Sequence, residues 1–253
     1  MDIYLAGVLW VLCAAAGGAV IAYLVRRLGP DEGRPDNNEA AGQVFTIIAG
    51  LHAVLVAFML ISLFDAVDET DEGSYREANS LVVASWAADS LPEPVGEQVR
   101  DLSRSYADTV VNKEWPRMRE GGEIPGEGWA RLDELRATVA QAPTVDDWQS
   151  DRKTEAANQL SEVYEARQER LTAAGAGGVG SVVWFVLVVG SVITVLLSNL
   201  FGGTKKKTHI VIVTTLCGVI AMLLFAIYQL QNPFGGGARV EPDAFQWAIA
   251  RVS

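Results

Sequence analysis

Four long apolar segments, none of which contains Asp, Glu, Lys or Arg, constrain this chain more than any other feature. They cover residues 3–25, 44–64, 179–201 and 210–230. A helix of about 20 apolar residues is long enough to cross the roughly 30 Å of hydrocarbon in a bilayer. The sequence therefore predicts four transmembrane helices and a multi-pass protein of the cell membrane.

The segment between the second and third spans is polar and acidic. Residues 65–178 contain 24 acidic and 12 basic side chains, a net charge of -12, against -11 for the whole chain. Apolar residues recur there every three or four positions, between breaks rich in Pro and Gly, as is typical of packed amphipathic helices. We therefore predict an all-α membrane protein with an all-helical soluble domain inserted between the second and third spans.

These features divide the chain into four parts. Residues 1–64 hold the first two spans, 65–178 the acidic helical domain and 179–230 the last two spans. Residues 231–253 form a Pro233-Phe234-Gly235 turn and a short amphipathic helix, which lies either on the membrane interface or on the soluble domain. We expect the helix of the second span to continue towards Pro92. Thr144, with Asp147 three residues later, resembles a capping box that starts a long helix.

The second span carries one ionisable residue, His52. An ionisable side chain at that depth is costly and usually faces a bundle interior or an aqueous path. Helical spacing places it on one stripe with Val56, Met59 and Leu63, and these four are the candidate pore-lining residues. The alternative is a neutral imidazole hydrogen-bonded to a neighbouring helix.

The second span ends in a group of carboxylates that begins at Asp65 and continues with Asp68, Glu69 and Glu72. If several copies of the chain surround a pore, these residues form a cation funnel; otherwise they are the solvated end of a helix. Their spacing does not match the calcium loop of an EF-hand. The sequence contains no catalytic constellation, metal-ligand spacing or phosphate-binding loop, so we expect neither an enzyme nor a bound cofactor or metal.

Basic residues in the short loops predict the orientation. Arg26, Arg27 and Arg34 follow the first span, and Lys205, Lys206 and Lys207 lie between the third and fourth. Because basic loops stay in the cytoplasm, the helical domain is predicted to be extracytoplasmic. The three lysines are a topology signal or, alternatively, a site for anionic lipid. The acidic domain disfavours nucleic acid as a partner.

Several short motifs, in this order and spacing, resemble the bacterial bestrophin-like domain family of four-span membrane proteins. They are an Asn-x-x-x-Gly-x-x-Phe pattern and a later Ala-Phe within residues 37–58, Glu77-Ala78, Leu91-Pro92-Glu93-Pro94, Tyr106-Ala107, Glu114-Trp115-Pro116, Tyr164-Glu165-Ala166-Arg167 and Pro233-Phe234-Gly235. The resemblance covers almost the whole chain.

The resemblance implies a function, because bestrophins are pentameric ion channels whose second span lines the pore. It also implies a calcium clasp after the Pro-Phe-Gly turn, but Gly236-Gly237-Ala238-Arg239 occupies that place here. Bestrophins keep their termini and large domain in the cytosol, opposite to the orientation predicted from charge. We retain the prediction from charge, because the two basic loops agree with each other.

Two functions follow as hypotheses. The first is a homo-oligomeric ion channel, a pentamer by family analogy, which embeds in membrane lipid and conducts inorganic ions with a preference for cations. The second is a membrane-anchored interaction or sensory module without transport activity, since the spans carry few polar residues beyond His52, Thr214 and Thr215.

Overall fold

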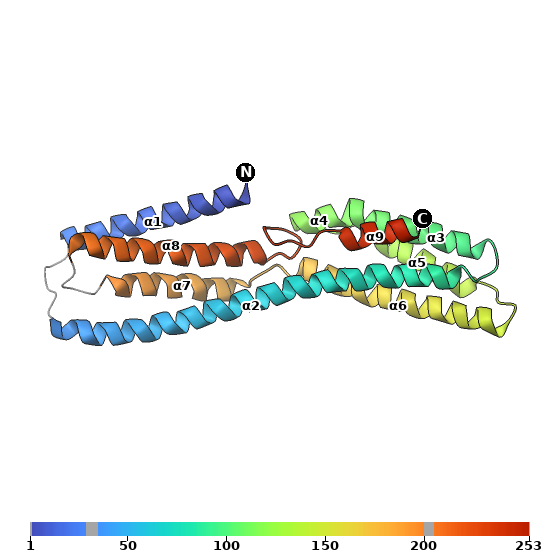
Figure 1. The fold of residues 1–253 in the computed structure, drawn as a ribbon, viewed down its shortest axis with the longest axis horizontal. Coiled ribbons are helices and arrows are strands. Elements are labelled where there is room, and N and C mark those ends of the chain that lie inside the picture. Colours follow the sequence, from blue (N-terminus) through green and yellow to red (C-terminus); the bar gives the residue numbers. More distant parts are fainter. Residues whose placement is uncertain (1, 29–34, 200–204, 253) are drawn as a thin grey trace. The chain divides into compact units, whose positions relative to one another are not determined.

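The structure is a computed structural model that describes residues 2–28, 35–199 and 205–252 (Figure 1). Four of its helices are long and apolar enough to cross a membrane: α1 (Ile3–Leu28), α2 (Pro35–Ala88), α7 (Ser181–Ser198) and α8 (Lys206–Leu230). All regular structure in the described residues is helical, so the all-α fold with four candidate spans is confirmed. Arg34 and the last two residues of the third predicted span, 200 and 201, lie outside the described residues.

The chain forms two compact units. The membrane unit comprises Met1–Phe64 and Gly178–Gln231, and the helical unit comprises Asp65–Gly177 and Asn232–Ser253. Helix α2 contributes to both units, because it is helical from Pro35 to Ala88. The expected continuation of the second span as a helix is therefore observed, and α2 ends shortly before Pro92.

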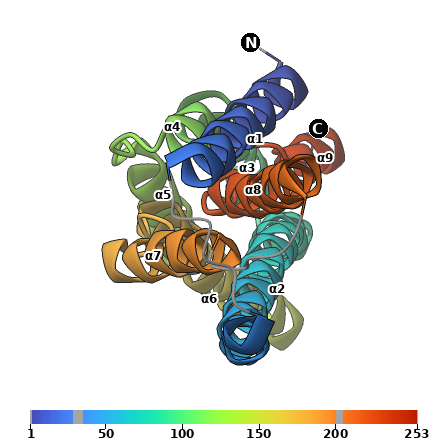
Figure 2. The ribbon, with the colours of Figure 1, turned by 90° about the vertical axis from the view of Figure 1, so that its left-hand side faces the viewer.

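In the membrane unit, α1 and α8 pack against each other along their lengths and run in opposite directions (Figures 1 and 2). Glycines allow the close approach: Gly7 lies against the ring of Phe225, and Gly18 lies against the side chain of Cys217. Small residues at helix contacts are typical of membrane proteins, where packing replaces the hydrophobic effect as the driving force. Helix α7 packs on α8, and α2 contacts α7 through His52.

The helical unit has a dense apolar core. The C-terminal part of α2 packs there with α3 (Val95–Thr109), the π-helix η1 (Val110–Glu114), α4 (Trp115–Glu120), α5 (Glu127–Gln141), α6 (Asp147–Gly175) and α9 (Asp243–Arg251). Phe245 and Ala248 of α9 are fully buried in this core. Of the two locations considered for the terminal helix, α9 therefore occupies the one on the helical domain.

The start of α6 differs from the expectation. Its N-cap is Asp146, whose carboxylate accepts a hydrogen bond of 2.7 Å from the backbone N–H of Gln149. The predicted cap at Thr144 is thus wrong by two residues. Asp and Thr are both good N-caps, so the Thr-x-x-Asp spacing did not identify which side chain takes the position.

Candidate functional site

His52 of α2 is hydrogen-bonded to α7. Its Nε2 lies 3.1 Å from Ser191 Oγ, and Ser191 Oγ also lies 2.7 Å from the carbonyl oxygen of Leu187. A hydroxyl has one proton, which Ser191 donates to that carbonyl, so the Ser191 oxygen accepts and His52 Nε2 donates. The network therefore assigns His52 a protonated Nε2. This is the hydrogen bond that the packing interpretation of His52 requires.

A hollow of about 180 Å³ opens next to His52 between α2, α7 and α8. Its polar members are His52, Ser191 and Thr194, and the rest of the lining is aliphatic. The imidazole packs directly on Gly190, where even a methyl group would overlap Nδ1. Ser191 and Thr194 both donate to carbonyls of their own helix. The hollow thus carries little free hydrogen-bonding capacity.

The other predicted pore-lining residues share this covered face of α2. Val56 and Leu63 are only 5% and 8% exposed, and Met59 is half-buried. The opposite face is open, with a row of apolar side chains that are each more than half exposed: Ile47, Leu51, Val54, Phe58 and Ile61. The predicted stripe and this open row are therefore different faces of one helix.

The predicted cation-funnel residues are all exposed. Asp65, Asp68 and Glu72 continue the spacing of the open row at intervals of three and four residues, and Glu69 lies beside them. In residues 2–28, 35–199 and 205–252, no group of three or more His, Cys, Asp or Glu side chains is arranged to hold a metal ion.

The helical unit contains a buried charge network that the sequence analysis did not predict. It consists of Glu77 of α2, Tyr106 of α3, Glu114 of η1, and Arg167 and Arg170 of α6. The side chains of both glutamates and both arginines are completely shielded from solvent. Two positive and two negative charges balance within the core.

Each arginine binds a carboxylate through two nitrogens. Arg170 donates to Glu77 from Nε (2.8 Å) and Nη2 (3.0 Å), and Arg167 donates to Glu114 from Nη1 (3.0 Å) and Nη2 (2.6 Å). Arg170 Nη2 also reaches Glu114 at 3.2 Å, which joins the two pairs. Tyr106 completes the network, since its hydroxyl donates to Glu77 and accepts from Arg167 Nη1 at 3.2 Å. Such forked, charge-assisted bonds are strong and directional.

Aromatic rings enclose both guanidinium groups. Arg167 lies over Trp129 at 4.6 Å from the ring centroid, and Arg170 lies near Phe245 at 5.3 Å and Trp115 at 5.7 Å. Contact with aromatic faces stabilises cations that have lost their water. Gly128 closes one side, because a methyl group there would overlap Glu114 and Arg167.

The proton donors Tyr106 and Arg170 keep their protons across the physiological range. Burial, and then the charge of Glu77, raises the pKa of Tyr106 far above its usual value. Burial by itself would lower the pKa of Arg170, but the charge of Glu77 and the hydrogen bonds to it raise that pKa above its usual value. The network therefore acts as a fixed clamp between α2, α3, η1 and α6.

The π-helix η1 brings Glu114 into this network. Pro116 follows at the start of α4; it lacks an N–H group, and its ring would clash with the carbonyl four residues earlier in a regular α-helix. One π-turn accommodates the proline and rotates the residues after it relative to α3. Trp115 is fixed at this point by a hydrogen bond from Nε1 to the carbonyl of Val240 (3.2 Å) and by edge-to-face contact with Phe234.

Motifs far apart in the sequence meet at this network. Glu77, Tyr106, Glu114 and Arg167 each belong to one of the motifs that carry the family resemblance, and Phe234 of the Pro-Phe-Gly turn packs on Trp115. One signal could have revealed it: Arg167 and Arg170 continue the apolar face of α6 set by Leu160 and Val163, at helical spacing. Charges on a buried face require partners.

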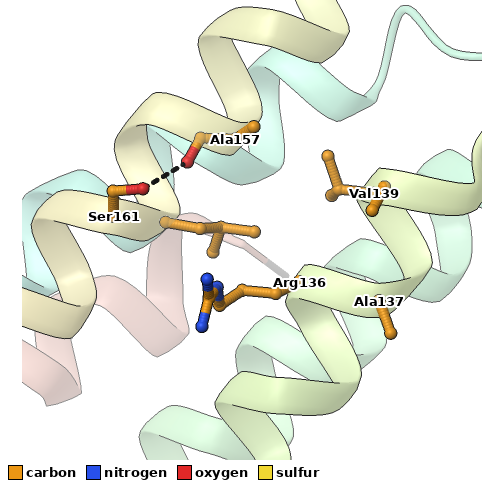
Figure 3. A pocket seen from close by; sticks show the side chains of 7 residues that line it. Arg136, Ala137, Val139, Ala157 and Ser161 are labelled. Atoms are coloured by element: carbon orange, nitrogen blue, oxygen red, sulfur yellow. Dashed lines mark hydrogen bonds between the residues drawn. The ribbon is translucent and has the colours of Figure 1, made fainter.

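A second hollow lies on the helical unit between α5 and α6 (Figure 3). It measures about 340 Å³ and is lined by Arg136, Ala137, Val139, Ala140, Ala157, Leu160 and Ser161. Ser161 donates to the carbonyl of Ala157, and the guanidinium of Arg136 lies 5.8 Å from the ring centroid of Tyr164. Its polar side chains are thus already engaged, and we regard this hollow as a minor candidate.

Comparisons with known proteins identify relatives by family and by fold. A family model described as Bestrophin-like domain matches residues 12–245. A bacterial bestrophin homologue from Klebsiella pneumoniae is similar, with 12% identity and a TM-score of 0.67 over 99% of this chain and 97% of that one. A mutant of such a homologue from the same organism gives a TM-score of 0.69 at 12% identity, over 100% and 97% of the chains.

A further crystal structure, described as that of a membrane protein, has a TM-score of 0.69 at 12% identity, over 97% of both chains. At these identities the solved structures establish a shared fold. A comparison with curated proteins finds no significant match.

Proposed function

The chain belongs to the bestrophin-like domain family, and from this premise we propose that it forms a homo-oligomeric ion channel in the membrane, with α2 lining the pore. The open face of α2 carries this proposal. Leu51, Phe58 and Ile61 on that face are 68%, 67% and 55% exposed, so their own protomer leaves them uncovered. A pore shared by several protomers must be lined by side chains of this kind.

The spacing of the open row supports an arrangement of α2 helices around an axis. Leu51, Val54, Phe58, Ile61, Asp65, Asp68 and Glu72 follow one another at intervals of alternately three and four residues. A 3.5-residue repeat keeps one face of a helix turned towards neighbouring helices that wrap around it with a left-handed twist. By analogy with bestrophins, the oligomer is a pentamer.

The acidic continuation of the row supports a preference for cations. Asp65, Asp68, Glu69 and Glu72 are exposed, and their multiplication by the subunit number would form a ring of negative charge at the pore entrance. Rings of carboxylates raise the local concentration of cations and repel anions. Inorganic cations are therefore the proposed permeant ions.

The stripe of His52, Val56, Met59 and Leu63 provides the alternative lining. For this stripe to face a pore, the contact between α2 and α7 through His52 and Ser191 would have to open. The open row needs no such rearrangement, and we therefore favour it.

Planar-bilayer recording of the purified oligomer tests the proposal. We expect unitary currents whose reversal potential in a KCl gradient shifts towards the chloride potential in the Asp65→Asn/Asp68→Asn/Glu72→Gln variant.

Thiol modification tests which face of α2 lines the pore. In a Cys13→Ala/Cys217→Ala background, a charged thiol reagent should reduce the current of Phe58→Cys, whereas Val56→Cys is the matched control on the covered face. Block at position 56 alone would favour the His52 stripe. If a confirmed oligomer shows no conductance at any tested voltage, pH or calcium concentration, the proposal of an ion channel is wrong.

One observation favours the second candidate, a membrane-anchored interaction or sensory module. Val145, just before α6, and Trp148, in its first turn, are 78% and 59% exposed, and exposed aromatic side chains are frequent in protein interfaces. A pull-down in which wild type captures a specific partner and Trp148→Ser does not, together with absent ion flux, would support this module. Measurable ion flux with no partner would count against it.

For both candidate functions, the basic residues in the two short loops support an extracytoplasmic helical unit, because basic loops tend to stay in the cytoplasm. A reporter fused after Ser253 distinguishes the two orientations, and a cytoplasmic readout would reverse this assignment.

A further inference from the structure

One end of the membrane unit carries a cluster of cations from two helices. Arg27 lies in the last turn of α1, Lys205 is the N-cap of α8, and Lys206 and Lys207 are its first residues. The antiparallel packing of α1 and α8 brings them together around Tyr23: Lys206 Nζ lies 4.2 Å from the centroid of the ring, and Arg27 Nη1 donates to the hydroxyl at 3.5 Å. We call Arg27, Lys205, Lys206 and Lys207 the basic end; all four are exposed.

The lysines occupy a place that helix electrostatics disfavour. The N-terminus of a helix carries a partial positive charge and unpaired N–H groups, and it is normally stabilised by acidic residues or a side-chain cap. Helix α8 has no acidic residue in its first turn and no capping hydrogen bond from Lys205. Across the described ranges, none of the four cations of the basic end forms an ion pair. An anion bound here would relieve both the repulsion and the missing cap.

The basic end lies where each apolar helix meets polar sequence. Helix α1 is apolar up to Val25, and α8 becomes apolar from Ile210 onwards. Apolar side chains next to the cluster are open to the surroundings: Leu24 is 43%, Val211 63% and Ile212 50% exposed. A tyrosine at this level is typical of the membrane–water interface. A ligand that fits both features has an anionic phosphate joined to hydrocarbon chains.

We propose that the basic end binds the headgroup of an anionic phospholipid. The lipid phosphate lies between the lysines at the start of α8, and its acyl chains run along the exposed side chains of α1 and α8. A role of the lysines as a topology signal would require neither the contact of Lys206 with Tyr23 nor an uncapped helix. The proposal rests on the membrane unit alone and holds whether or not the protein conducts ions.

Native mass spectrometry of the full chain in detergent tests this site, because orientation in a membrane then has no influence. We measure binding of phosphatidylglycerol against phosphatidylcholine for wild type and for Lys205→Gln/Lys206→Gln/Lys207→Gln. Each cation near an anionic headgroup contributes roughly fivefold in affinity, so the triple variant should bind phosphatidylglycerol roughly 100-fold more weakly. The single Lys206→Gln variant should lose about fivefold on the same basis.

Two matched variants separate the site from total charge. Arg104→Gln/Arg117→Gln/Arg131→Gln removes three exposed cations from the helical unit and should retain wild-type binding. Lys205→Arg/Lys206→Arg/Lys207→Arg retains the charge and should also bind. Circular dichroism and elution volume confirm that each variant is folded.

Competition with inorganic phosphate distinguishes a lipid from a free anion. Phosphate should displace the lipid only at concentrations far above that of the lipid itself. The proposal is overturned if phosphate competes at equal concentration or if phosphatidylcholine binds as tightly as phosphatidylglycerol. It is also overturned if Lys205→Gln/Lys206→Gln/Lys207→Gln and Arg104→Gln/Arg117→Gln/Arg131→Gln bind phosphatidylglycerol equally well.

Discussion

The membrane unit and the helical unit are both made of helices, but different interactions hold them together. In the membrane unit, α1 and α8 meet through Gly7 and Gly18, and the side-chain hydrogen bonds between helices are isolated ones such as that from His52 to Ser191. In the helical unit, an apolar core surrounds the network of Glu77, Tyr106, Glu114, Arg167 and Arg170.

The difference reflects the two surroundings. Lipid offers no hydrophobic gain when helices associate, so close packing of small residues must supply the attraction. Water drives apolar side chains into a core, and that gain offsets the cost of burying two arginines with their carboxylates. The helical unit therefore depends on complete partnering of a few charges, whereas the membrane unit depends on many small contacts.

The largest expected effect is in the network. Arg170→Met removes the cation that pairs with Glu77, while Glu114 keeps Arg167, so one buried negative charge is left uncompensated. Breaking a buried ion pair in this way costs about 3–5 kcal/mol. Thermal unfolding in detergent, followed by circular dichroism, measures the loss as a lower Tm.

The adjacent pair provides the control for this variant. Arg76 and Glu169 also join α2 to α6, but their side chains are 52% and 63% exposed. Arg76→Met should therefore cost less than about 1 kcal/mol. Equal losses at positions 76 and 170 would contradict a special role for the buried network.

The membrane unit is tested at the close contact between α1 and α8. In Gly18→Ala, the added methyl group would come within 2.8 Å of Cys217 Cβ, so α1 and α8 must separate. Overpacking of this kind costs about 1–3 kcal/mol. Gly17→Ala is the control, since no heavy atom lies within 4 Å of a methyl group there. If both variants unfold at the same temperature in detergent, close packing is not what joins these helices.

The stability of the fold at alkaline pH depends on the protonation of Tyr106. Its pKa is raised in the folded chain, so above about pH 10 the unfolded chain loses the phenolic proton while the folded chain keeps it. The stability that this group contributes is complete below pH 10 and falls by about 1.4 kcal/mol per pH unit above it.

In Tyr106→Phe this alkaline loss is absent, so its stability deficit relative to wild type should shrink as the pH rises from 10 to 11. Chemical unfolding at both pH values measures the difference. Tyr75→Phe, at an exposed position outside the network, is the control. A deficit for Tyr106→Phe that does not change with pH would show that the buried hydroxyl is not held neutral by the network.

The smallest effect is expected at His52. Ser191→Ala removes its hydrogen-bond acceptor, and such bonds between membrane helices contribute about 0.6 kcal/mol on average. Thr194→Val, which loses only a bond within α7, is the control in the same thermal assay. A loss comparable to that of Arg170→Met would mean that the membrane unit also depends on a critical polar contact.

The local features of the fold were predictable from sequence, and the network was not. Hydrocarbon thickness sets the length of a span, so four charge-free segments were enough to predict α1, α2, α7 and α8. Helical periodicity and the prolines likewise predicted a helical domain after the second span and the region in which α2 ends. Glu77, Glu114 and Arg170 lie far apart in the sequence and meet only in the folded chain, and the π-helix η1 has no periodic signal of its own.

The candidate pore face shows the same limit. Periodicity grouped His52 with Val56, Met59 and Leu63, but a helix in a membrane is apolar on every side, so sequence alone did not indicate which side its own protomer covers. The exposure of Phe58 and the burial of Val56 provide that information.

Because α9 is part of the core of the helical unit, the order in which the chain is synthesised affects when that core can form. The core of the helical unit contains Phe234 and Phe245, which the ribosome makes only after the last span. The two candidate spans α7 and α8 separate these residues in the sequence from the rest of that core. The core of the helical unit is therefore complete only after both candidate spans have been synthesised, so a chain that stops before residue 232 lacks part of it.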